Sequence, residues 1–344
     1  MDAKPETPTP TPTLKLVKEL PRQEIVFALA HPPDTRRLVF GGSDFRVYDV
    51  DLARDKPEPR ALEGGGHDSY VTGLVAADAG RWAVSGGYDG RLIWWDLEHG
   101  TRVRAVEAHR KWIRKVAATC DCEGATIASV ADDMVCRLWD AGTGALRHEL
   151  RGHEAMTPHH FPSMLYACAF TPDGLHIATG DKVGHVVVWD VETGKPAATL
   201  EAPVMYTWDP VQRRHSIGGI RALAFTPDGD RLAVGGIGKI GNIDLLDGPA
   251  RLEVFDWRKG ERTHEFGDLP KGIVERLEFH PDGNRLLAVG GANDGFLLVL
   301  DLDAKSVLVQ MKAPTHVHDA TFDDTPDTLY TAAHGKVAVY ELKG

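Results

Sequence analysis

The chain contains three short apolar stretches that end in Trp-Asp: LIWWD at residues 92–96, CRLWD at 136–140 and VVVWD at 186–190. Four others have the same form with a different apolar residue before the acid: FRVYD at 45–49, LEVFD at 252–256, LLVLD at 297–301 and VAVYE at 337–341. Their final acids are 47, 44, 50, 66, 45 and 40 residues apart. Five of these gaps lie near the repeat of roughly 40–45 residues that is typical of a propeller blade.

A second signal, in phase with the first, is a Pro-Asp-Gly turn between two apolar runs. The turns are clearest at 170–174, 225–229 and 279–283. Proline presets φ for such a turn and glycine supplies a positive φ. The runs on either side, such as IRALAF at 220–225, alternate with period two, which indicates strands. Each unit therefore reads as four short strands, and seven units follow one another.

These residues resemble the WD40-repeat family, in the style of its bacterial members, over about residues 13–344. The resemblance implies an all-β, seven-bladed β-propeller with four-stranded antiparallel blades. It also implies a buried hydrogen-bonded tetrad of His, Ser or Thr, Asp and Trp in each well-preserved blade. The matching residues are His67, Ser85, Asp89 and Trp95; His109, Ser129, Asp133 and Trp139; and His153, Thr179 and Trp189, with the turn acid displaced to Asp181. The other four blades lack the full set and depend more on apolar packing.

The last unit lacks a fourth strand, because only three residues follow Glu341. The segment LKLVKEL at 14–20 resembles the fourth strands of other units. We therefore predict that this N-terminal strand completes the last blade and closes the ring, which removes exposed strand edges. Residues 1–12, rich in Pro and Thr, are expected to be a disordered tail, and 13–344 a single propeller domain. The ends favour a self-contained chain over a domain cut from a larger protein.

The bulk composition narrows the function classes. A net charge of −11 argues against general nucleic-acid binding. No apolar run is long enough to span a membrane, and no secretory signal begins the chain. Four cysteines are too few for a disulfide framework. These features predict a cytoplasmic protein, monomeric on its own, without nucleic-acid or membrane partners.

Two regions are expected to bind a protein or peptide partner, because long loops on a rigid scaffold concentrate binding residues. In the family, the loops before each first strand and those between the second and third strands share the top face. Three long ones, at about 153–164, 201–217 and 237–250, should stand together there. The second region is the channel rim, where a basic, aromatic patch around Trp112 suggests a partner with an acidic segment; a solvated charged face with a half-packed Trp is the alternative. The predicted partner-binding residues are Tyr70, Arg110, Lys111, Trp112, Arg114, His159, His160, Phe161, Met164, Tyr206, Trp208, Arg213, Arg214 and His316.

No catalytic residue, metal ligand or cofactor is predicted. Cys120 and Cys122 lack a second cysteine pair for zinc, and Cys136 and Cys168 suit small buried apolar positions. The doublet His159–His160 reads as solvated loop histidines. The rim is expected to be mostly apolar, without converging carboxylates. The sequence thus favours a non-catalytic interaction scaffold; the alternative is a propeller hydrolase or oxidoreductase with a metal or acidic site in its channel.

Overall fold

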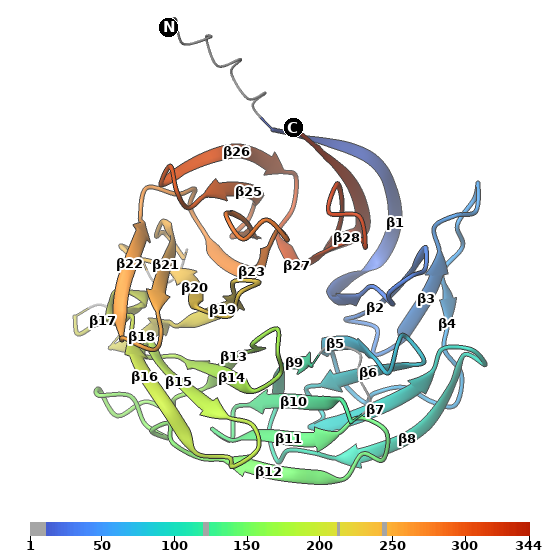
Figure 1. Cartoon of the computed structure of the whole chain (residues 1–344), viewed down its shortest axis with the longest axis horizontal. Coiled ribbons are helices and arrows are strands. Elements are labelled where there is room, and N and C mark those ends of the chain that lie inside the picture. The colour runs from blue at the N-terminus through green and yellow to red at the C-terminus, as the bar shows by residue number, and fades with distance from the viewer. Residues whose placement is uncertain (1–11, 120–123, 212–213, 243–245) are drawn as a thin grey trace, which may run out of the picture.

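The protein is a ring of antiparallel sheets around a central axis, and the chain runs once around it (Figure 1). The structure, a computed structural model, describes residues 12–119, 124–211, 214–242 and 246–344. In these residues the only helix is the three-residue 3₁₀ turn η1 (Pro203–Met205), so none is long enough to cross a membrane. The predicted tail at 1–12 falls, apart from residue 12, outside the described residues.

Five of the sheets have four strands each, paired in chain order from the axis outward (Figure 1). They are β5 (Val71–Ala77), β6 (Trp82–Gly87), β7 (Arg91–Asp96) and β8 (Thr101–Glu107); β9 (Ile113–Ala118), β10 (Thr126–Ala131), β11 (Cys136–Asp140) and β12 (Leu146–Leu150); β13 (Leu165–Phe170), β14 (His176–Asp181), β15 (His185–Asp190) and β16 (Pro196–Glu201); β19 (Ile220–Phe225), β20 (Arg231–Ile237), β21 (Ala250–Asp256) and β22 (Glu261–Phe266); and β23 (Ile273–Phe279), β24 (Arg285–Gly291), β25 (Gly295–Asp301) and β26 (Ser306–Ala313). A separate hairpin pairs β17 (Tyr206–Asp209) with β18 (His215–Gly218).

The sixth sheet of the ring joins the two ends of the chain. It has six strands in the order β27 (Val317–Phe322), β28 (Thr328–Lys343), β1 (Thr13–Ala30), β2 (Arg37–Gly42), β3 (Val47–Asp51) and β4 (Arg60–Ala61). The first half of β1 pairs with β28, from Thr13 opposite Lys343 to Pro21 opposite Lys336. Its second half pairs with β2. The N-terminal strand therefore closes the ring against the last repeat, as the sequence predicts.

The prediction of seven separate blades is wrong in its count of sheets. The seven sequence repeats are accommodated in six hydrogen-bonded sheets, five of four strands and one of six. The reason is that β1 runs for 18 residues without a break and serves both the last repeat and the first. A continuous strand joins its two neighbours into one sheet, which a count of repeats in the sequence does not reveal.

The core lies between neighbouring sheets. Every residue of β6 and β10 is buried, because the second strand of a repeat is covered on both faces. Trp94, Ile113 and Trp139, for example, belong to one apolar cluster between two adjacent sheets. Leu14 of β1 packs in the same way against the end of the chain at Leu342.

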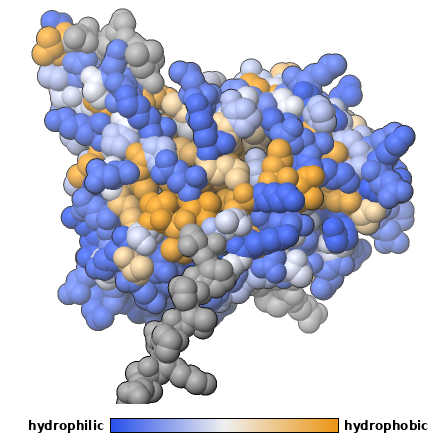
Figure 2. Space-filling view, turned by 90° about the horizontal axis from the view of Figure 1, so that it is seen from above, coloured by the Kyte–Doolittle hydropathy of each residue, from blue (hydrophilic) through white to orange (hydrophobic). Residues whose placement is uncertain are grey.

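The outer surface of the ring carries both apolar and hydrophilic residues. Figure 2 views it from the side of β1, β26 and β28 and shows apolar residues along its middle between hydrophilic margins. The large exposed apolar side chains on these strands are Leu16, Val17 and Val307.

A β-bulge recurs in the innermost strand of each of the seven repeats. The register of pairing skips one residue near the start of that strand each time. A bulge turns its extra residue out of the regular alternation. The skipped residues are Phe27, Thr72, Arg114, Tyr166, Arg221, Glu275 and His318, and all seven line a cavity of 220 Å³, together with Tyr88 and Lys115.

Candidate partner-binding face

Backbone hydrogen bonds define one face of the ring, called here the top face. The residue before an innermost strand accepts a bond from the turn between the second and third strands of its repeat. Tyr88 N–H donates to Tyr70 O at 2.9 Å, Asp132 N–H to Trp112 O at 3.1 Å, and Lys182 N–H to Met164 O at 3.0 Å. The two kinds of loop therefore lie on one face, as the family resemblance implies.

The repeat of β5–β8 holds its top loop in place with a buried polar network. His67 Nδ1 is 3.0 Å from an Asp89 carboxylate oxygen, and its Nε2 is 2.8 Å from Ser85 Oγ. Trp95 Nε1–H donates to the same Ser85 Oγ at 2.9 Å. Because a carboxylate only accepts, the imidazole proton belongs on Nδ1 and the serine hydroxyl donates to Nε2. Each of the four groups thus has a partner.

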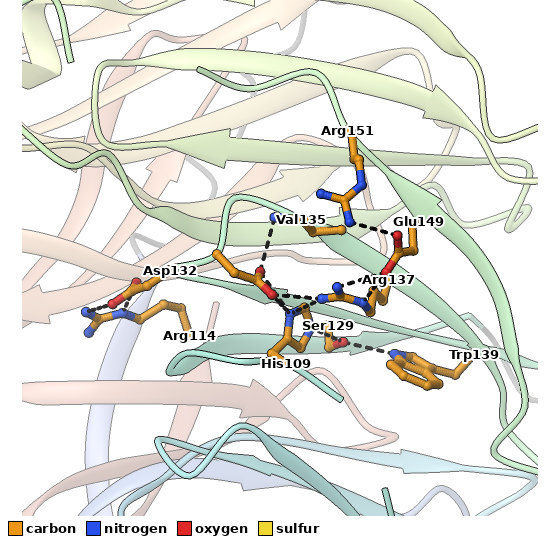
Figure 3. Close-up of polar contacts among 10 residues, drawn as sticks. His109, Arg114, Ser129, Asp132, Val135, Arg137, Trp139, Glu149 and Arg151 are labelled. Carbon is orange, nitrogen blue, oxygen red and sulfur yellow. Dashed lines mark hydrogen bonds and ion pairs between the residues drawn. The ribbon is translucent and has the colours of Figure 1, made fainter. Parts of the chain in front are cut away.

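The repeat of β9–β12 builds the same network (Figure 3). His109 lies 3.0 Å from Asp133 and 2.8 Å from Ser129, and Trp139 donates to Ser129 at 2.9 Å. Arg137 Nη1 adds a bond to Asp133 at 2.9 Å. Burial by itself raises the pKa of the Asp133 carboxyl, but the hydrogen bonds from His109 and Arg137 outweigh it and hold that pKa well below its usual range.

The third network uses the displaced acid. His153 Nδ1 is 2.9 Å from Asp181, its Nε2 is 2.8 Å from Thr179 Oγ1, and Trp189 donates to Thr179 at 2.9 Å. Asp181 is 1% exposed and also accepts two backbone N–H bonds. The displacement costs no hydrogen bond, because the turn after β14 folds back over the acid.

Four aromatic rings form a continuous row on the top face, which we call the aromatic arc: Phe45, Tyr70, Tyr88 and Trp112. Successive ring centroids are 5.8, 5.8 and 4.5 Å apart, and the last pair is stacked with 6° between the ring planes. Phe45, Tyr70 and Trp112 are 38%, 40% and 49% exposed. The arc crosses three successive repeats, and contiguous exposed apolar rings of this kind mark interaction sites.

Arg114 supports the arc instead of presenting a free charge. Its guanidinium makes two bonds of 2.7 Å to Asp132 and one of 2.8 Å to Tyr88 Oη. It also lies 5.1 Å from the centre of the Trp112 ring. Burial lowers the pKa of Arg114, but the hydrogen bonds that it donates to Asp132 outweigh this effect and keep that pKa above its usual value. Lys115 is likewise engaged, 3.4 Å from Asp319. The predicted basic patch therefore reduces to the exposed Arg110 and Lys111.

The three long loops lie together. The His159 ring stacks on Trp208 and on Tyr206, with 4.5 and 5.7 Å between the ring centroids. Its Nδ1 is 3.0 Å from Tyr206 Oη. Phe161 contacts Trp208 at 5.4 Å. The third loop is tied to the hairpin β17–β18, since Ile240 N–H donates to Thr207 Oγ1 at 3.0 Å. We call these rings (His159, Phe161, Tyr206 and Trp208) the loop cluster.

Some predicted site residues lie elsewhere. His159 is wrongly described as a solvated loop histidine, because it is stacked and hydrogen-bonded, whereas His160 is exposed. His316 is 8% exposed and packs inside the channel. Met164 is half-buried beside the arc, and Arg214 is exposed at the tip of the hairpin. Arg213, Cys120 and Cys122 fall outside the described residues, and Cys136 and Cys168 are buried thiols.

The channel also differs from expectation. The cavity at the ring centre contains Arg114, Lys115, Arg221, Glu275 and His318, so its lining is not mostly apolar. The bulges are the cause, because they turn residues toward the axis that period-two alternation assigns to other faces. Phe45 and Tyr88 of the arc were missed for another reason: both lie in turns between the second and third strands, where no periodic signal exists.

Radial antiparallel sheets with repeated His, Ser or Thr, Asp and Trp networks define a β-propeller repeat protein. Residues 61–96, 100–140 and 144–190 match the family model "WD domain, G-beta repeat", and these segments hold the three complete networks. The chain therefore carries WD40 repeats.

Three curated proteins resemble the chain at low identity. It is 26% identical over 263 residues to telomerase protein component 1 of Mus musculus, covering 76% of this chain and 8% of that protein. The corresponding Rattus norvegicus protein is 26% identical over 269 residues, covering 78% and 9%. A guanine nucleotide-binding protein subunit beta of Oryza sativa subsp. japonica is 25% identical over 249 residues, covering 71% and 58%. The chain thus spans less than two thirds of each of these relatives.

Proposed function

We propose that the protein is a non-catalytic scaffold that binds a protein or peptide partner on its top face, with the aromatic arc as the main contact. The observation that carries this proposal is the exposure of three large rings in one row. Trp112 is nearly half exposed, yet it is held by stacking on Tyr88 and by its contact with Arg114. A rigid exposed Trp loses little side-chain entropy on binding, and Trp and Tyr dominate interface hot spots.

The surroundings of the arc favour an acidic segment in the partner. A pocket of 420 Å³ beside Trp112 is lined by Arg110, Lys111 and Met164, among others. Arg110 and Lys111 are exposed and form no ion pair among the described residues, so a carboxylate can reach them. The loop cluster offers a second aromatic surface on the same face. The names of the relatives, which describe a component and a subunit, agree with a role in assemblies.

The proposal covers further points. Residues 13–344 act as one domain, and the chain is a monomer until it meets its partner. The site of action is the cytoplasm, which suits two buried unpaired thiols. The proposed role requires no cofactor, nucleic acid or membrane.

The test is affinity capture from the source cell followed by binding measurements with the captured protein. Trp112→Ala should weaken binding at least tenfold, a loss expected for a hot-spot residue, with an unchanged melting temperature. Leu146→Ala is the matched control, because Leu146 is 48% exposed but lies on the outer strand β12. Equal binding by both variants would remove the arc from the interface.

The contribution of the loop cluster to binding is better tested with a point substitution than with a shortened loop. Shortening 201–217 would delete Met205, which is fully buried in the core between two sheets. Trp208→Ala leaves that core intact and tests the cluster by itself.

A further inference from the structure

Two of the bulges bring metal-binding side chains together in the central cavity. Glu275 is the bulge residue of β23 and His318 that of β27 in the adjacent sheet. His316 lies two residues before His318 on the same side. One ligand atom from each of the three lies within 4.8 Å of the other two, and Glu275 Oε1 is 3.3 Å from His316 Nε2. We call these three residues the His-Glu cluster.

The imidazole of His316 is oriented as a metal ligand is. His316 Nδ1–H donates to the carbonyl of Ala292 at 3.1 Å, which fixes the ring and directs Nε2 into the cluster. Ligating histidines commonly use their other nitrogen in this way. Nε2 of His318 is buried and makes no hydrogen bond among the described residues, and Nε2 of His316 faces the Glu275 carboxylate. Buried polar atoms without a partner are uncommon and point to a missing ligand.

From this geometry we propose that Glu275, His316 and His318 bind one divalent transition-metal ion, zinc foremost, at the centre of the ring. Two imidazoles and one carboxylate form a donor set typical of zinc sites that keep an open position. Metal–ligand bonds of about 2.0–2.2 Å put two ligand atoms of a tetrahedron about 3.4 Å apart. The pair Glu275–His316 already has that spacing. His318 stacks on His316 with 4.4 Å between the ring centroids, so its ring has to turn to bring Nε2 to the ion. The remaining coordination position faces the cavity.

A second cluster of His31, Asp323 and Asp324 has similar spacing but is a poorer site. His31 Nε2 is 3.1 Å from both the carbonyl of Thr35 and Asp323. Asp323 accepts a bond from Tyr330, and Asp324 one from a backbone N–H. These atoms have partners already, whereas Nε2 of His318 makes no hydrogen bond among the described residues.

The experiment uses the full chain without an affinity tag, freed of metal with a chelator. Zn²⁺ is titrated by calorimetry, and Co²⁺ is added to observe its visible absorption as a probe of coordination. We expect one ion per chain with a Kd of about 1 µM or below. His316→Gln and His318→Gln should each weaken binding at least tenfold and abolish the zinc-dependent rise in melting temperature. If a histidine variant does not fold, Glu275→Gln replaces it as the test, because Gln is nearly equal to Glu in size.

His334→Gln and His31→Gln are the controls. His334 stacks on His318 at 4.9 Å but lies outside the cluster, so its variant should bind zinc as the parent does. Failure of the parent protein to bind Zn²⁺ would overturn the proposal and leave the pair Glu275–His316 as a simple ion pair. Loss of binding in His31→Gln alone, or no loss in the three cluster variants, would overturn it too.

Discussion

The pairing of β1 with β28 makes a sharp prediction, because two leucines on one strand differ in burial. Leu14 is 7% exposed and packs in the cluster with Leu287 and Leu342. Leu16, two residues on, is 43% exposed. Replacing a buried Leu by Ala costs about 2–5 kcal/mol, through lost burial and the cavity left behind. For Leu16 only partial burial is lost, about 0.5–1 kcal/mol.

Leu14→Ala should therefore lower the free energy of unfolding by about 2 kcal/mol more than Leu16→Ala. With an unfolding entropy of about 2.1 cal/mol/K per residue, a loss of 3 kcal/mol lowers the Tm of a chain of this length by about 4 °C. Urea denaturation followed by tryptophan fluorescence and scanning calorimetry measure both quantities. Equal losses in the two variants would refute the register of β1 against β28.

Deletions at the N-terminus test the pairing of β1 with β28 by removing the whole segment. Deleting residues 1–11 removes no residue of β1, which begins at Thr13, and should leave the Tm unchanged. Deleting residues 1–20 removes Leu14, Leu20 and the strand that covers β28. The expected loss, at least about 5 kcal/mol, approaches the whole stability of a typical domain. Similar Tm values for the two truncations would contradict ring closure by this strand.

Three further predictions follow from the polar networks and the arc. Ser129→Ala leaves a buried indole N–H and a buried imidazole nitrogen unpaired. It should lower the free energy of unfolding, measured by urea denaturation, by about 2–3 kcal/mol. Substitution of the exposed Ser306 by Ala is the control and should lower it by less than about 0.5 kcal/mol. The pKa of Asp89 is depressed in the folded state; its contribution is therefore full above the unfolded pKa of about 3.9 and is lost as the pH falls further. Asp89→Asn, less stable at pH 7, should accordingly show a shallower fall in Tm between pH 5 and 3; parallel curves would contradict the assignment. Arg114→Ala should lower the Tm because it breaks the paired bonds to Asp132, whereas Arg110→Ala should not; an unchanged Tm in both would mean that Arg114 does not support the arc.

Much of the fold is visible in the sequence because it follows from short-range patterns. The alternating runs predict the strands, and the spacing of His67, Ser85 and Trp95 predicts which groups meet. Even the closing strand at 14–20 is recognisable, since its partner segment lacks a fourth strand. The number of sheets is not, because it depends on whether β1 bends or breaks between its two partners, and neither Pro21 nor Arg22 interrupts its extended backbone.

The candidate sites were less predictable for a different reason. Trp112 and Tyr70 precede strands and can be found by alignment, but Tyr88 and Phe45 lie in turns without a pattern. The sequence assigned Arg114 to partner binding, but its guanidinium is hydrogen-bonded to Asp132, a residue 18 positions away. Glu275 and His318 are 43 residues apart in the sequence and meet only because each occupies a bulge. Contacts that depend on a local break in alternation have no signature in hydrophobic periodicity.

The continuous strand β1 also sets a condition on how the protein is made. Its first half leaves the ribosome early, but the strand that covers it, at the far end of β28, follows about 300 residues later, which takes tens of seconds at about 5–20 residues per second. During that interval Leu14, whose apolar neighbours include Leu287 and Leu342, has no native apolar surface to cover it. A chaperone that shelters the nascent N-terminus would act in this interval, and slowing translation of the final repeat would lengthen the protein's exposure to aggregation.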